Sequence, residues 1–271
     1  MGLREEYNEY CFKFKKVWKY LNSCSKPLDT IVEEVCKLRL YYDCEDRWKK
    51  ILSETGIAFV SEETCDYSKL KSDEFKDLGL FSDEGYFLLN ERYILPIKDM
   101  KGNILALVGW YPDSKKYITT PSKFFLKDCL FFGLEQLDKT GLGKDYFVVE
   151  GIFDSLSIRS MGYNAVAQMG INSSRVKVAL YGMFRKLVGV PDNDTQGRNV
   201  LKRDAWKLPR NASYLRWVGN FESSNSEDED EKEVAIKDID KLCNLYEEDS
   251  VKELLGNCLK ENKRVIKIDL S

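Results

Sequence analysis

The chain has 271 residues, of which 43 % are hydrophobic and 13 % aromatic, enough for a packed globular protein of one large or two modest domains. Its 42 basic and 45 acidic residues leave a formal net charge of −3, so a nucleic-acid partner has to be inferred from charge segregation. No apolar run approaches the roughly 20 residues that cross a bilayer, and we therefore expect no membrane partner.

The chain contains eight cysteines and no histidine, and the cysteines form no Cys-x-x-Cys pair. This composition argues against a structural zinc site and against histidine-based triad or general-base chemistry. Scattered cysteines are typical of reduced thiols. We therefore expect a cytoplasmic protein with free thiols and without zinc.

Residues 1 to about 55 are predicted to be helical. Apolar side chains such as Tyr10, Phe14, Val17 and Leu21 recur at helical spacing, and Asp29 is expected to cap a second helix. The apolar positions of that second helix are Ile31, Val32, Val35, Leu38 and Leu40. Lysines line the other face of the first helix, and we interpret this face as an ordinary solvated surface in preference to a DNA contact.

From Arg92 the pattern changes to strands. Residues 93–97 and 104–110, joined by a turn that contains Gly102, predict a β-hairpin. Short strands are expected at 117–121 and 130–134. Aromatic side chains within these strands, Trp110 and Tyr117, favour a core position over base stacking.

Two acidic turns in the second half match each other. The apolar run 146–149 ends in Glu150-Gly151, with Asp154 close behind, and the run 186–190 ends in Pro191-Asp192-Asn193-Asp194, with Gly197 close behind. Each run is typical of a buried parallel strand. Ligands of open α/β sheets bind outside the carboxyl ends of such strands, so Glu150, Asp192 and Asp194 are expected to meet. Carboxylates gathered without histidine favour Mg²⁺ or Mn²⁺.

This pair of turns resembles the Toprim motif, with residues 162–170 similar to the family's second strand. An upstream stretch resembles the basic domain of DnaG-type primases, in Arg92–Gly102, Lys116–Pro121 and Phe125–Leu134. The resemblance spans roughly residues 73–255. Together with the patterns above, it predicts a Rossmann-like, largely parallel α/β Toprim domain at 143–271 with a short C-terminal helical and strand tail. An N-terminal helical and mixed α+β basic domain at 1–142 is expected to precede it.

The end of the chain carries a third acidic element. A helix is expected to about residue 207, followed by a strand at 214–218 and an acidic block at 223–233 that we expect to be a solvated loop. The next segment, Lys237-Asp238-Ile239-Asp240, resembles the Lys-Asp-Pro-Asp of the family, with Ile239 in place of proline. The resemblance assigns Asp238 and Asp240 to the metal site. A helix at 249–260 and a strand at 264–269 are predicted to follow.

The resemblance implies a DNA primase that makes short RNA primers from NTPs on single-stranded DNA, with two or more Mg²⁺ or Mn²⁺ ions. Glu150, Asp192 and Asp194 are the expected catalytic residues, and all three, with Asp238 and Asp240, are expected metal ligands. The role of Glu150, base or ligand, stays open, and Gly151, Asp154 and Gly197 are expected to support the site. The expected nucleotide and template contacts are Arg92, Lys98, Lys101, Lys116 and Lys127.

Two other functions remain open at this point: a metal-dependent Toprim nuclease and a catalytically idle replication module. A zinc-binding template reader and a helicase-binding helical domain, which full-length bacterial primases contain, are not expected in this chain. We therefore expect a compact primase core that works alone or recruits partners such as a replicative helicase.

Overall fold

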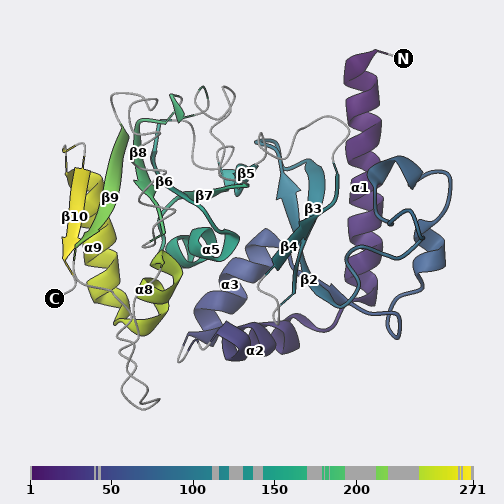
Figure 1. The fold of residues 1–271 in the computed structure, drawn as a ribbon, viewed down its shortest axis with the longest axis horizontal. Helices are drawn as coiled ribbons and strands as arrows, with labels where there is room; N and C mark the ends of the chain where they lie inside the picture. The colour runs from purple at the N-terminus through teal and green to yellow at the C-terminus, as the bar shows by residue number, and fades with distance from the viewer. Residues whose placement is uncertain are drawn as a thin grey trace. The chain divides into compact units, whose positions relative to one another are not determined.

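The computed structural model describes residues 2–39, 41, 44–111, 116–121, 131–136, 143–169, 179, 181–182, 184–192, 212–218, 238–261, 263 and 265–269. The chain divides into two compact units, Met1–Lys139 and Thr140–Ser271. Most helices and strands of both are labelled in Figure 1. Among the helices that the structure describes, none is long and apolar enough to span a membrane.

The first unit begins with three helices, α1 (Leu3–Cys24), α2 (Leu28–Arg39) and α3 (Glu45–Thr55). The predicted apolar stripe of α1 is buried, because side chains three and four positions apart share one face of a helix. Two details of α2 differ from expectation. Asp29 lies inside its first turn, since the Pro27 carbonyl already accepts the N–H of Ile31, and Leu38 in the last turn is 46 % exposed.

An antiparallel sheet with the order β1-β2-β3-β4 forms the core of this unit. Its strands are β1 (Ala58–Val60), β2 (Arg92–Lys98), β3 (Ile104–Tyr111) and β4 (Lys116–Thr119), with the 3₁₀ helices η1 (Tyr67–Leu70) and η2 (Lys76–Leu78) between β1 and β2. The predicted hairpin is the β2–β3 pair. The helix α1 packs on this sheet, and the Tyr10 hydroxyl donates to the Leu105 carbonyl of β3 at 3.3 Å.

The second sheet has six strands in the order β10-β9-β8-β6-β7-β5. They are β5 (Phe131–Phe132), β6 (Asp145–Val149), β7 (Ala165–Gln168), β8 (Lys186–Val190), β9 (Ala212–Val218) and β10 (Val265–Asp269). The pairs from β7 through β6, β8 and β9 to β10 are all parallel. The α/β class and the largely parallel sheet expected from the sequence are therefore confirmed for the second half of the chain.

Three described helices accompany this sheet: α5 (Ile152–Ser160), α8 (Ile239–Leu245) and α9 (Glu248–Lys260). The α5 helix packs on β6, β7 and α8, so that a helix from the middle of the chain meets one from near its end. The expected helix after Gly197 and the acidic block at 223–233 lie outside the described residues.

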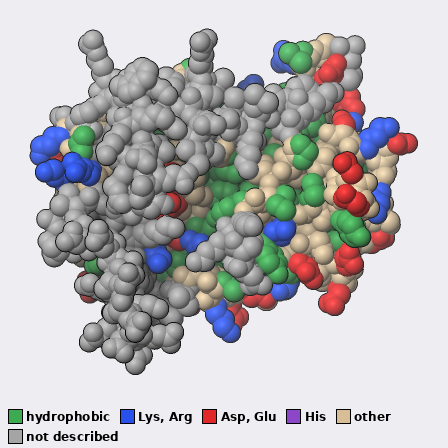
Figure 2. Space-filling model, viewed as in Figure 1, with side chains coloured by type: hydrophobic (Ala, Val, Ile, Leu, Met, Phe, Trp, Pro, Cys, Tyr) green, Lys and Arg blue, Asp and Glu red, His purple; other side chains and the backbone are tan. Residues whose placement is uncertain are grey.

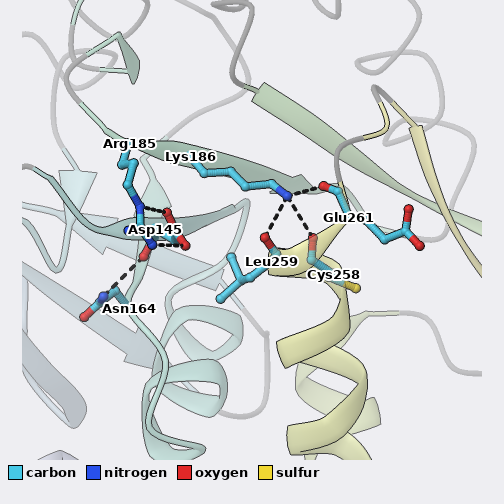
Figure 3. Close-up of polar contacts among 7 residues, drawn as sticks. All are labelled: Asp145, Asn164, Arg185, Lys186, Cys258, Leu259 and Glu261. Carbon is cyan, nitrogen blue, oxygen red and sulfur yellow. Dashed lines mark hydrogen bonds and ion pairs between the residues drawn. The ribbon is translucent and has the colours of Figure 1, made fainter.

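Polar contacts fix α9 to the start of β8 (Figure 3). The Lys186 ammonium donates to the backbone carbonyls of Cys258, Leu259 and Glu261 at the carboxyl end of α9, at 2.7 Å for Leu259. The neighbouring Arg185 binds both carboxylate oxygens of Asp145, at 2.8 and 2.7 Å. Lysine in this position complements the negative end of the helix dipole and satisfies carbonyls that lack a partner within the helix.

Candidate acidic site

The two acidic turns leave the second sheet at the same edge. Strands β6 and β8 are adjacent and parallel, and Val149 lies opposite Val190. Neighbouring strands are about 4.8 Å apart, so Glu150 and Asp192, which follow these strands, lie close to one another at the carboxyl edge. Both residues are half-buried. Asp194 and Gly197, the other residues expected in the second turn, lie outside the described part of the chain.

The first turn continues directly into α5. Gly151 precedes the helix, and its N–H donates to Asp154 Oδ2 at 3.1 Å. A Cβ atom at position 151 would lie only 2.4 Å from that oxygen. Any larger residue at position 151 would therefore have to displace the Asp154 carboxylate, which favours glycine for a reason that the sequence did not reveal.

The other oxygen of Asp154 binds the third acidic element. Asp154 Oδ1 accepts the backbone N–H of Asp240 at 3.1 Å, and Asp154 and Asp240 are only 8 % and 1 % exposed. Asp238 is half-buried and caps α8, since its side chain accepts the N–H of Lys241 at 2.9 Å. The buried Asp154 thus joins the start of α5 to the start of α8.

Two neutral side chains hold the Asp240 carboxylate. Its Oδ1 accepts the hydroxyl of Ser157 at 2.5 Å and the amide of Asn244 at 3.1 Å, and the same amide also lies 3.1 Å from Ser157 Oγ. Sequence reasoning missed both Ser157 and Asn244. The signal was present in the spacing, because Ser157 follows Asp154 by three positions and Asn244 follows Asp240 by four, which places each pair on one helix face.

Negative charge accumulates around Asp154. Burial raises the pKa of its carboxyl group well above the ordinary value, and the nearby charges of Asp238, Asp240 and Asp192 raise it further. All three acidic elements therefore contribute to one electrostatic environment. Oxygen donors with excess negative charge fit a hard divalent cation. Within the described residues, no three acidic or cysteine side chains surround one point as a ligand set, and Asp194 is not among those residues.

The expected cationic positions differ in how they are engaged. The Lys98 ammonium donates to the Thr55 carbonyl at the end of α3 at 2.7 Å. Arg92 donates to the Leu88 carbonyl, and its guanidinium lies 5.3 Å from the centre of the Tyr111 ring. Lys101 is exposed. The side chain of Lys116 and the whole of Lys127 lie outside what the structure describes.

The visible face of the first unit carries acidic and basic groups side by side (Figure 2). Several lysines of the first unit form ion pairs, such as Lys13 with Asp77 and Lys16 with Glu74. The predicted core position of Trp110 is confirmed, since that side chain is 2 % exposed, and Tyr117 is half-buried.

The chain is similar to known proteins in both sequence and fold. Residues 147–232 match a family model described as Toprim-like. The chain is also similar to the DNA primase of Aquifex aeolicus, with 28 % identity over 206 residues that cover 72 % of this chain and 38 % of that protein. The DNA primase of Mycoplasma pneumoniae is 25 % identical over 248 residues, which cover 86 % of this chain and 37 % of that protein.

Solved structures extend the likeness to the fold of both units. A DnaG primase catalytic domain bound to single-stranded DNA superposes with a TM-score of 0.72 at 17 % identity, covering 94 % of this chain and 80 % of that one. The RNA polymerase domain of Mycobacterium tuberculosis primase DnaG gives a TM-score of 0.67 at 17 % identity, covering 94 % and 84 %. The fold is thus that of DnaG catalytic cores. The chain spans less than two fifths of the length of the two primase relatives named above.

Proposed function

We propose that this chain is the catalytic core of a DNA primase, a nucleotidyltransferase that synthesises short RNA primers on single-stranded DNA. One observation carries the proposal: the parallel β6–β8 register delivers Glu150 and Asp192 to one edge of a sheet whose fold is shared with DnaG catalytic cores. Asp154 and Asp240 lie in the same electrostatic environment as Asp192. This matches the need of nucleotidyl transfer for clustered carboxylates.

We assign the cation to carboxylates of the three acidic elements, of which Glu150, Asp192 and Asp238 are half-buried. Glu150, Asp192, Asp194 and Asp238 are proposed to hold Mg²⁺ or Mn²⁺, which stabilises the attacking and leaving oxygens and the triphosphate charge. Asp240 supports them from the interior, because it is only 1 % exposed and its Oδ1 is already bound by Ser157 and Asn244. Asp154 orients the turn after Glu150 through the N–H of Gly151.

The substrates carry dense negative charge, so cationic side chains are also required. We propose that the exposed Lys101, together with Lys116 and Lys127, contacts the template or nucleotide phosphates. Arg92 and Lys98 are expected to contribute less, because their donors already bind backbone carbonyls within the first unit. A replicative helicase is a further proposed partner.

The direct test is incubation of the protein with single-stranded DNA, NTPs and Mg²⁺ or Mn²⁺, followed by separation of labelled products on a denaturing gel. Short RNA products are expected from the parent, whereas Asp192→Ala and Asp194→Ala should each abolish them. Asp249→Ala is a matched control, because Asp249 is an exposed carboxylate in the first turn of α9. It should retain the parent's activity.

Other outcomes would refute the proposal. Cleavage of the DNA without NTP incorporation would indicate a metal-dependent nuclease, and a protein that neither polymerises nor cleaves would indicate an interaction module.

For the cationic side chains, Lys116→Ala and Lys127→Ala should reduce the salt dependence of DNA binding while metal affinity is retained. Unchanged DNA and NTP binding in both variants would remove these lysines from the site.

A further inference from the structure

Two neutral side chains join the middle of α5 to the start of α8. The Ser157 hydroxyl of α5 donates to Asp240 Oδ1 at 2.5 Å, and the Asn244 amide of α8 lies 3.1 Å from both Asp240 Oδ1 and Ser157 Oγ. The same amide donates to the Asp240 backbone carbonyl at 2.6 Å. Ser157 is fully buried, Asp240 is 1 % exposed and Asn244 is half-buried, so water competes little for these bonds.

The α8 helix depends on tertiary contacts for its position because it is short. It has seven residues, which is about two turns, and an isolated helix of that length is not stable in water. Its buried apolar side chains Ile239, Leu242 and Cys243 hold it against the rest of the unit. Apolar burial is non-directional. The hydrogen bonds of Ser157 and Asn244 therefore supply the directional contacts that fix where the helix starts.

These bonds connect two helices that each begin beside a carboxylate expected to bind the cation. Glu150 precedes Gly151, and α5 follows at once. Asp238 is the residue immediately before α8, and its side chain moves with the helix start because it accepts the N–H of Lys241 at 2.9 Å. The placement of Asp238 relative to the Glu150 turn is thus transmitted through the contact between α5 and α8.

We propose that Ser157 and Asn244 are positioning residues for the divalent cation, which act through Asp240 and raise the affinity of the site by fixing Asp238. The inference rests on the proposed function, which assigns the cation to Glu150, Asp192, Asp194 and Asp238. A carboxylate that is already held in place loses less conformational freedom when the ion binds. Hydrogen-bonding partners behind metal-binding residues typically contribute about 10- to 100-fold in metal affinity.

The test titrates the metal-free protein with Mn²⁺ and follows the decrease of the free Mn²⁺ signal by electron paramagnetic resonance, so that no catalytic turnover is needed. Ser157→Ala and Asn244→Ala should each weaken Mn²⁺ binding by about threefold, because each leaves the other side chain on Asp240, and the double variant by about tenfold or more. Both substitutions remove neutral groups, so a lower affinity cannot result from a change in the charge of the site.

Tyr163→Phe is the matched control for a general loss of stability. It removes a neutral hydroxyl of the same unit, which donates to the Lys252 carbonyl at 2.6 Å. Tyr163 lies two residues before β7, at the amino edge of the parallel strands, whereas the acidic turns leave at the carboxyl edge. Circular dichroism and urea unfolding should show that every variant is folded under the conditions of the titration. Tyr163→Phe should bind Mn²⁺ as tightly as the parent.

The outcomes separate this inference from the proposed function. A parent that binds Mn²⁺, with a double variant that binds it as tightly as Tyr163→Phe does, would overturn the inference and leave the proposed function standing. A parent that binds no Mn²⁺ would overturn the cation assignment of the proposed function together with the inference. If the double variant does not fold, the single variants decide, because unchanged affinity in both would contradict the role of Ser157 and Asn244.

Discussion

The buried hydrogen bonds around the Asp240 carboxylate can be tested by removing the hydroxyl of Ser157. Its bond to Asp240 Oδ1, at 2.5 Å, joins a neutral donor to a carboxylate that is 1 % exposed. Hydrogen bonds to charged groups contribute about 1.5–3 kcal/mol. In Ser157→Ala, Asn244 still donates to the same oxygen at 3.1 Å, so part of the stabilisation remains. We expect the free energy of unfolding to fall by about 2 kcal/mol.

The control is another serine of the same helix. Ser160 donates its hydroxyl to the Ser157 carbonyl at 2.7 Å and touches no carboxylate in that bond, so Ser160→Ala should stay within about 0.5 kcal/mol of the parent. Ser160→Ala also serves as a correction for helix propensity, because both variants replace a serine of α5 by alanine, which has the higher helix propensity.

Urea unfolding followed by circular dichroism measures the difference between these variants. In a double-mutant cycle, Ser157→Ala and Asp240→Asn should show a coupling energy of about 0.5–3 kcal/mol, because the two side chains share one bond. Equal stability of the Ser157→Ala and Ser160→Ala variants would refute the idea that the bond to Asp240 stabilises the fold.

Three further predictions follow from other contacts. Because the pKa of Asp154 is raised, the folded protein binds a proton more tightly than the unfolded chain. The metal-free protein should therefore lose stability as the pH rises from about 4 through the raised pKa. The urea midpoints measured at pH 5 and pH 7 should differ less in Asp154→Asn than in the parent. Lys186→Met should lower the free energy of unfolding in urea by about 1–3 kcal/mol, because three carbonyls at the carboxyl end of α9 lose their donor. Lys252→Met, at an exposed helix ion pair, should lower it by about 0.5 kcal/mol or less. Gly151→Ala should lower the thermal midpoint, since the new Cβ would lie 2.4 Å from the Asp154 carboxylate; an unchanged midpoint would show that Asp154 can move freely.

Strand periodicity and turn chemistry were sufficient to predict the second sheet, since β6 and β8 are apolar runs that end in acidic turns. Periodicity could not reveal how Asp240 reaches Asp154, because that contact joins residues 86 positions apart through a backbone N–H. Composition also predicted free thiols, and the cysteines that the structure describes are free. Helical spacing indicated the buried face of α2 but not that Leu38 in its last turn would be 46 % exposed.

Two helix starts converge on the Asp154 carboxylate. The N–H of Gly151 before α5 and that of Asp240 in α8 both donate to it, and backbone N–H groups at helix starts carry partial positive charge. These donors do not outweigh burial and the neighbouring carboxylates, because the pKa of Asp154 is still raised. The site therefore favours the gain of positive charge, as a proton or as a cation. Since both would neutralise the same cluster, affinity for Mg²⁺ should fall as the pH is lowered and Asp154 becomes protonated.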